Sequence, residues 1–218
     1  MHADAAMAQT RTDPATKSIG CIVPVSTVMA EVSRDRTFYD QSGGGVTVSG
    51  GEPMEQVEFL DALLRASREA GLHTAVDTCG YAPYESFEQI YDWTDMFLFD
   101  LKLMDPHEHL EYTGVPNELI LENLSLLAGL GDKVWLRIPL VPGVTDTDRN
   151  LSAISRFVEP LNSVRRVSLL PYNELGEDKI DRYQLARERL NLKRQANDDL
   201  QKIASRFVDL GCDVTIGG

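Results

Sequence analysis

Residues 42–53 read Ser-Gly-Gly-Gly-Val-Thr-Val-Ser-Gly-Gly-Glu-Pro, a short β-branched strand that ends in two glycines, an acid and a proline. Glycines at a strand end let a ligand approach the backbone, because no Cβ stands in the way. Glu52 adds a carboxylate there, which suits a ligand ammonium group rather than a phosphate. The same residue types also form ordinary turns between a strand and a helix. The stretch therefore leaves two interpretations open, a plain turn or one edge of a ligand site.

Strand-like and helix-like segments alternate along the rest of the chain, a pattern typical of parallel strands joined by helical crossovers. The predicted strands cover residues 46–49, 73–77, 96–101, 133–141, 164–170 and 213–216. The predicted helices cover residues 26–40, 56–70, 84–93, 117–130, 146–160 and 195–210. Two of the strands, 96–101 and 133–141, are nearly continuous apolar runs, which predicts burial on both faces. The sequence thus predicts an α/β fold.

The length and composition of the chain limit the number of domains and the classes of partner. With 218 residues, 43% of them hydrophobic, the chain is long enough for one domain with a substantial core. We expect that domain to span residues 21–218, after a disordered N-terminal segment, residues 1–20. The net charge of −13 argues against nucleic acid or an anionic membrane surface as a partner. No apolar run approaches the ~20 residues of a membrane span, and we expect a cytoplasmic protein.

Polar residues follow several of the predicted strands. Asp77, Asp100 with Lys102, and Asn173 each come at the end of an apolar run, as Glu52 does. Ligands of α/β sheets and barrels gather at the carboxyl ends of the strands. Asp100 and Lys102 are two residues apart, so on an extended strand they face the same side. They form either a simple ion pair or part of a site for a zwitterionic ligand.

A set of short motifs gives the chain a family resemblance. Together they resemble the activating enzymes of glycyl radical enzymes, the pyruvate formate-lyase activating enzyme-like branch of the radical S-adenosylmethionine superfamily. The resemblance extends from about Val23 to Gly218. The motifs are Gly50-Gly51-Glu52-Pro53, Asp77-Thr78, Asp100-Leu101-Lys102, Arg137-Ile138-Pro139 and Leu170-Pro171-Tyr172-Asn173. The resemblance implies a partial (β/α)6 barrel of the radical-SAM type, missing its first strand, which would precede Val23.

The resemblance also implies the role of each motif. Gly50, Gly51 and Glu52 would bind the amino-acid end of S-adenosylmethionine, and Asp100-Leu101-Lys102 would line the same pocket. Asp77, Thr78 and Asp100 match positions around a monovalent cation, which makes Asp77 and Asp100 its candidate ligands. Asn173 stands where the family usually has a histidine near the adenosyl group. Asparagine keeps hydrogen-bonding capacity but does not titrate near neutral pH.

The family holds a [4Fe–4S] cluster on three cysteines spaced three and then two residues apart, and such clusters need clustered thiolates. This sequence contains Cys21, Cys79 and Cys212, far apart from one another. No iron–sulfur ligands are therefore identified, and the cluster is not expected in this chain. In the family, reductive cleavage of S-adenosylmethionine yields a radical that takes hydrogen from a glycine of the partner enzyme. We expect this chain to be truncated and inert alone, and no catalytic residue is identified.

The resemblance names the partners of the full enzyme only by class. They are a glycyl radical enzyme, similar to pyruvate formate-lyase or to a diol dehydratase, and an electron donor such as flavodoxin or ferredoxin. Two alternatives differ in class: a non-catalytic fragment that binds S-adenosylmethionine or the partner, and a barrel lyase with Lys102 as a Schiff-base amine.

For four further residues we compare a functional role with a structural one. His107 and His109 are two apart, so on a helix they face different sides, and we do not predict a metal pair. For Cys79 we expect a structural role. Arg137 is expected either to pair with an acid or to meet the partner's glycyl loop. The charged stretch 174–194 is expected to be a solvated surface.

Overall fold

The computed structural model describes residues 21–173 and 192–217. The chain divides into two compact units, one ending at Leu98 and one starting at Phe99, and each is described by itself. Residues 1–20 and most of the charged stretch 174–194 lie outside the described residues. The expectation of one domain over residues 21–218 stays a prediction.

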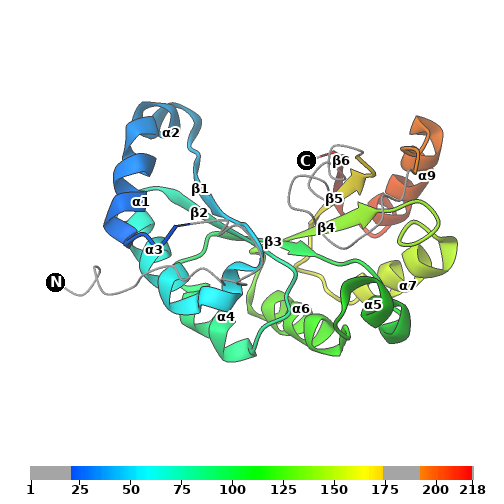
Figure 1. The fold of residues 1–218 in the computed structure, drawn as a ribbon. Helices are drawn as coiled ribbons and strands as arrows, with labels where there is room; N and C mark the ends of the chain where they lie inside the picture. The colour runs from blue at the N-terminus through cyan, green and yellow to red at the C-terminus, as the bar shows by residue number, and fades with distance from the viewer. Residues whose placement is uncertain (1–20, 174–191, 218) are drawn as a thin grey trace. The chain divides into compact units, whose positions relative to one another are not determined.

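All six predicted strands are present, and they follow chain order in the sheet, β1-β2-β3-β4-β5-β6 (Figure 1). The pairs β1–β2, β4–β5 and β5–β6 are parallel. This confirms the predicted α/β partial barrel. The bounds are Gly45–Val48 for β1, His73–Thr78 for β2, Met96–Asp100 for β3, Val134–Leu140 for β4, Arg166–Pro171 for β5 and Asp213–Ile216 for β6.

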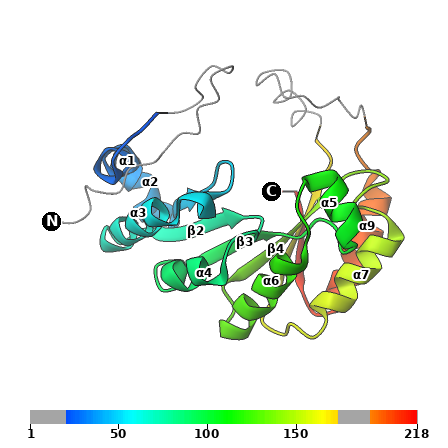
Figure 2. The same cartoon turned by 60° about the horizontal axis from the view of Figure 1, so that its bottom comes forward.

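The first unit is built around β1 and β2, with the helices α3 and α4 following them (Figure 2). Helix α3 turns a row of leucines, Leu60, Leu63 and Leu64, into the core. The chain leaves α3 through Gly71, whose φ of 73° lies in the left-handed region that favours glycine. The helical segments are α1 Val25–Val32, η2 Ser33–Asp35, α2 Arg36–Ser42, η3 Pro53–Gln56, α3 Val57–Glu69 and α4 Tyr84–Tyr91.

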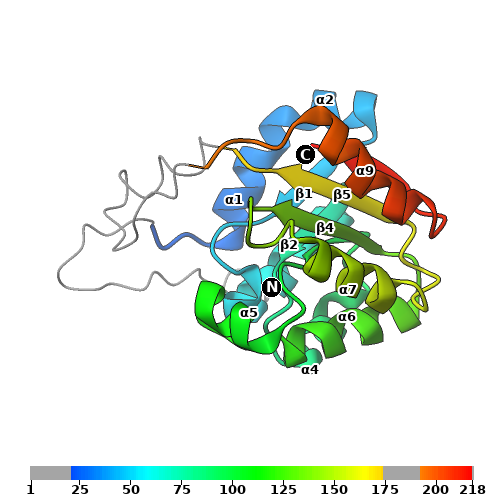
Figure 3. The same ribbon diagram turned by 90° about the vertical axis from the view of Figure 1, so that its right-hand side faces the viewer.

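The second unit pairs β4, β5 and β6, and Figure 3 shows α7 and α9 lying together in front of β4 and β5. Its helices are α5 Pro106–Thr113, α6 Glu118–Leu130, α7 Asp148–Val158 and α9 Asn197–Val208. The sequence did not predict α5 as a helix. Asp105 caps its N-terminus by accepting hydrogen bonds from the amides of His107 and Glu108, and Pro106 occupies its first turn. No helix in the described ranges is long and apolar enough to cross a membrane.

The prediction that two strands are buried on both faces is wrong. Along β4, buried and half-buried residues alternate: Leu136 and Ile138 are fully buried, while Trp135 and Arg137 are partly exposed. Strand β3 alternates in the same way. Apolar side chains on both faces of these strands hide the alternation in the sequence, because Trp135 and Pro139 are as hydrophobic as their buried neighbours. The two faces of these strands are therefore not equally buried.

Candidate functional site

The first unit places Gly50 and Gly51 just after β1, where their backbone is open. A Cβ built on either glycine meets no atom within 4 Å, and both residues are exposed. Gly50 has a φ of 140°, a conformation that L side chains rarely adopt. The backbone of the two glycines is therefore open to approach, and its role in a ligand site stays a prediction.

Glu52 is fixed by three hydrogen-bond donors of its own unit. Its Oε1 accepts from the Thr78 hydroxyl at 2.7 Å and from the Met54 amide at 3.3 Å. Its Oε2 accepts from the Cys79 amide at 2.8 Å. We call Glu52, Thr78 and Cys79 the Glu52 centre. Its donors are hydroxyl and amide groups, so none of them brings a charge that would offset a carboxylate, and Oε2 accepts one of the three hydrogen bonds.

The structure thus brings together two predicted site residues, Glu52 and Thr78, and adds one that the sequence analysis missed. Cys79 contributes its backbone amide to the centre, a role that any residue type could fill, so no side-chain signal could reveal it. Thr78 itself is buried, and its hydroxyl also accepts from the Gly80 amide at 3.0 Å. The turn after β2 is therefore wrapped around the Glu52 carboxylate.

Asp77 lies one residue before Thr78 and accepts a hydrogen bond from the Ser49 hydroxyl at 3.0 Å. The sequence analysis did not single out Ser49. Val48 pairs with Val76 in the parallel register, which brings the next residues of β1 and β2 side by side. This contact ties the ends of the two strands together beside the Glu52 centre.

The second unit gathers Asp100, Lys102 and Arg137, which we call the Asp100 centre. Arg137 meets Oδ1 of Asp100 with two nitrogens, Nε at 2.8 Å and Nη2 at 2.7 Å. The Nζ atom of Lys102 lies 3.4 Å from Oδ2. Two cations and one carboxylate leave a formal charge of +1. The ion pair of Asp100 with Lys102 and the pairing of Arg137 with an acid, each one of two interpretations left open by the sequence, are both confirmed.

The ion pair bears on the Schiff-base alternative for Lys102. Pairing with Asp100 uses the ammonium form, whose nitrogen has no lone pair with which to attack a carbonyl. Leu101, between the two, is buried, and its amide donates to the Arg137 carbonyl at 2.9 Å. Leu101 therefore holds the backbone of the centre, and its side chain belongs to the core.

Asn173 is exposed and follows β5 directly. The neighbouring Tyr172 amide donates to Oε1 of Gln195 at 3.3 Å. The Nε2 group of Gln195 donates in turn to the Leu140 carbonyl at 3.0 Å and to Asp146 at 2.8 Å. Gln195, which the sequence analysis missed, thus links the ends of β4 and β5 on which Asn173 depends.

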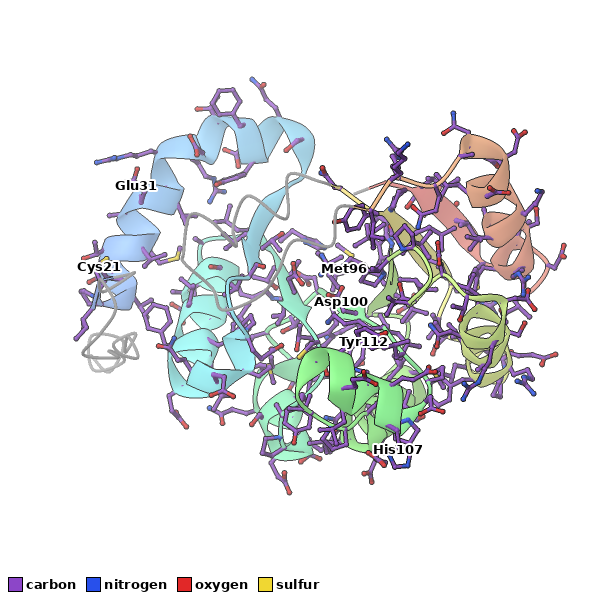
Figure 4. The ribbon with its side chains drawn as sticks, turned by 45° about the vertical axis from the view of Figure 1, so that its right-hand side comes forward. Cys21, Glu31, Met96, Asp100, His107 and Tyr112 are labelled. Carbon is purple, nitrogen blue, oxygen red and sulfur yellow. The ribbon has the colours of Figure 1, made fainter. Side chains whose placement is uncertain are left out.

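In the described ranges, no group of three or more His, Cys, Asp or Glu side chains is arranged to hold a metal ion. Figure 4 shows His107 on the outer edge of α5, away from Asp100. His109 is buried instead, with Nδ1 2.8 Å from the Val115 carbonyl. The structure therefore places the two histidines in different surroundings, one at the edge of α5 and one buried.

The cysteines do not fit an iron–sulfur cluster. Cys21 is exposed just before α1 (Figure 4), Cys79 is half-buried and Cys212 is buried. Burial raises the pKa of the Cys212 thiol, which disfavours the thiolate that iron binds. We derive no reaction step through a cluster in this chain.

Comparison with known proteins places this arrangement in a family. Residues 23–153 match the model of the Radical SAM superfamily. The chain is 39% identical over 207 residues to the trans-4-hydroxy-L-proline dehydratase activating enzyme of Clostridioides difficile, covering 94% of this chain and 68% of that enzyme. It is 35% identical over 193 residues to the pyruvate formate-lyase-activating enzyme of Staphylococcus aureus, covering 86% and 76% of the two chains.

A solved structure agrees with these relatives. The crystal structure of a domain of pyruvate-formate lyase-activating enzyme from Bacteroides vulgatus superposes with a TM-score of 0.67 at 32% identity, covering 80% of this chain and 99% of that domain. The chain belongs to the radical SAM superfamily. Within it, the chain is a member of the glycyl radical enzyme activating enzymes.

Proposed function

We propose that this chain is the S-adenosylmethionine-binding barrel of an activating enzyme that generates a glycyl radical on a partner enzyme. The observation that carries the proposal is the Glu52 centre, which directly follows the open backbone of Gly50 and Gly51 in the first unit. The Glu52 centre presents a carboxylate held only by neutral donors. The Asp100 centre, in the second unit, holds the Lys102 ammonium group beside a carboxylate. The ammonium group at the amino-acid end of S-adenosylmethionine suits the Glu52 carboxylate.

Each predicted residue then has a binding task. The open backbone of Gly50 and Gly51 receives the amino-acid end, and the remaining acceptor of Glu52 binds its ammonium group. Lys102 binds the carboxylate, and Asn173 hydrogen-bonds the adenosyl end. The Asp77 carboxylate, in the first unit, is the candidate ligand of a monovalent cation. Asp100 is less suited as a second ligand, because its carboxylate is already paired with Arg137 and Lys102.

When bound, S-adenosylmethionine supplies the radical chemistry by which the family abstracts hydrogen from a glycine, and the protein supplies binding and orientation. The partner is a glycyl radical enzyme, similar to pyruvate formate-lyase or a diol dehydratase. The electron donor of the activating enzyme is a flavodoxin or ferredoxin. The activating enzyme acts in the cytoplasm.

Calorimetric titration of the chain with S-adenosylmethionine tests the proposal. We expect saturable heat with one site, together with a rise in melting temperature. Binding of the ligand to the wild type but not to a Glu52→Ala variant supports the proposal. Absence of both heat and thermal shift in the wild type contradicts it.

A second candidate is binding without chemistry, and the scattered, unsuitable cysteines favour it for the chain by itself. Anaerobic incubation with iron, sulfide, reductant and S-adenosylmethionine distinguishes the two. Release of 5′-deoxyadenosine above the no-protein control would assign catalysis to this chain. No release, with binding retained, leaves the chain as a ligand-binding barrel.

A further inference from the structure

The turn that follows Asp100, residues 102–104, is held by an asparagine from a distant helix. Asn150, in the first turn of α7, is only 4% exposed. Its Nδ2 donates to the Lys102 carbonyl at 2.8 Å, and its Oδ1 accepts from the Met104 amide at 2.9 Å. Nδ2 also donates to the Thr145 carbonyl at 2.8 Å. One buried amide therefore bonds both ends of the turn, at Lys102 and at Met104.

A second buried asparagine completes the clamp. Asn117, 1% exposed, donates through Nδ2 to the carbonyls of Leu103 at 2.9 Å and Met104 at 3.0 Å. The two asparagines act at different points: Asn117 bonds the carbonyls of Leu103 and Met104, while Asn150 bonds the Lys102 carbonyl. Buried backbone groups that lose such partners are costly, so this turn has one well-defined conformation only while both amides are present.

The position of Asn150 is itself fixed locally. The Thr147 hydroxyl caps α7 by accepting from the Asn150 amide at 3.3 Å. An N-cap sets the direction of the first helical turn. The Thr147 cap therefore helps to orient the Asn150 side chain toward residues 102–104. Thr147, Asn150 and the Lys102 carbonyl form a continuous line of hydrogen bonds from the start of α7 to the Asp100 centre.

We propose that Asn150 is a positioning residue for Lys102: it fixes the backbone from which the lysine side chain reaches the ligand carboxylate. This inference rests on the proposed function, since it assumes that Lys102 meets the carboxylate of S-adenosylmethionine. Lys102 has a long, flexible side chain, and a defined Cα position limits the volume that its ammonium group explores. Asn150 acts through Lys102 and does not touch the ligand.

The test compares two ligands on an Asn150→Leu variant, which keeps the side-chain size and removes its polar atoms. S-adenosylmethionine carries the carboxylate, and 5′-methylthioadenosine lacks the whole amino-acid end. We expect the variant to bind S-adenosylmethionine about tenfold more weakly, the factor that 1.4 kcal/mol gives. The affinity for 5′-methylthioadenosine should stay within about twofold, the scatter of non-interacting changes.

Two further variants separate positioning from general damage. Ile154→Ala opens a cavity under the same helix, because Ile154 is fully buried, and leaves the Asn150 hydrogen bonds in place. It should lower the melting temperature without selective loss of S-adenosylmethionine binding. In a Lys102→Met background, Asn150→Leu should cause no additional selective loss. Equal losses for both ligands, or a selective loss that persists without Lys102, would overturn the proposal.

If Asn150→Leu does not fold, Thr147→Ala gives the same test in a milder form, because it removes only the cap that aims Asn150. A smaller loss, again confined to S-adenosylmethionine, supports the proposal, and equal losses overturn it. Failure of the wild type to bind S-adenosylmethionine at all would overturn the proposed function first, and the inference with it. The two failures are therefore distinguishable.

Discussion

The Glu52 centre and the Asp100 centre both place a carboxylate at a strand end, but they stabilise it in opposite ways. Glu52 accepts from a hydroxyl and two backbone amides. Asp100 accepts from a guanidinium and faces an ammonium group. Neutral donors orient a carboxylate without cancelling its charge, whereas cations neutralise it and add charge of their own. Two similar acids thus become a negative centre in one unit and a positive centre in the other.

The difference also decides how each centre depends on its surroundings. The donors of Glu52 are mostly backbone groups, so their geometry is set by the turn that follows β2 and by the start of η3. The Asp100 centre depends on two long side chains, each partly exposed, and on the backbone beneath them. The first centre is therefore rigid by construction, and the second needs supporting residues such as Asn150.

The largest predicted effect comes from removing the charge of Glu52. In a Glu52→Gln variant we expect roughly 100-fold weaker S-adenosylmethionine binding, the upper end for one hydrogen bond to a charged group. A glutamine side chain has one acceptor oxygen and one NH2 group. It therefore cannot accept hydrogen bonds from both Thr78 and Cys79 as the two carboxylate oxygens of Glu52 do. Calorimetry measures the affinity, with Glu55→Gln, an exposed neighbour in η3, as the control. Unchanged affinity would show that Glu52 is only a turn residue.

A tenfold effect is expected at Lys102. Replacing it with methionine keeps most of the side-chain volume and removes the positive charge, so binding of S-adenosylmethionine should weaken about tenfold, as for a typical charged hydrogen bond. Binding of 5′-methylthioadenosine should not change. Lys202→Met, at an exposed lysine of α9, is the matched control. If both ligands weaken equally, Lys102 supports the fold rather than the carboxylate.

A smaller effect is expected at Arg137. An Arg137→Leu variant leaves Asp100 facing Lys102 alone, so the formal charge of the Asp100 centre falls from +1 to zero. We expect affinity for S-adenosylmethionine to fall roughly fivefold, within the range of a partly screened charge. Arg156→Leu, exposed on α7, is the control. A gain in affinity would mean that Arg137 competes with the ligand for Asp100.

Asp95 offers a third carboxylate, outside both centres, that combines the two kinds of partner. Burial by itself would raise the pKa of Asp95, but hydrogen bonds from the amide and hydroxyl of Thr74, together with the Arg68 guanidinium, outweigh burial and hold the pKa below its ordinary value. The folded-state pKa is lower than that of the unfolded chain. Asp95 therefore stabilises the fold above about pH 4, the ordinary carboxyl value, and this contribution is lost as the pH falls through the folded-state pKa.

An Asp95→Asn variant should accordingly be less stable than the wild type at pH 7, by about 1–3 kcal/mol, the cost of weakening hydrogen bonds to a charged, partly buried group. The difference in unfolding free energy should shrink as the pH falls from 5 to 3. Urea unfolding at several pH values measures it, with Asp92→Asn as the matched control. A difference that stays constant with pH would contradict the assignment.

Much of the fold could be predicted because alternation and turn residues are local signals. All six strands and the polar residues at their ends follow from apolar runs and the residues that punctuate them. The period of two along a strand also predicts that Asp100 and Lys102 share a side. The same reasoning failed for burial on β3 and β4, since apolar residues occupy both faces and only the packing of helices decides which face is covered.

The sequence by itself determined the family, the order of the strands and the positions of the acids and the lysine at their ends. Only the tertiary structure decided which donors each carboxylate meets. Arg137 reaches Asp100 across 37 residues of chain, and Asn150 reaches Lys102 across 48. Hydrogen bonds depend on angles and on distances of a few tenths of an ångström, which no residue pattern fixes. The residue pattern therefore identifies the charged groups. The tertiary structure determines their partners and so the net charge of each centre.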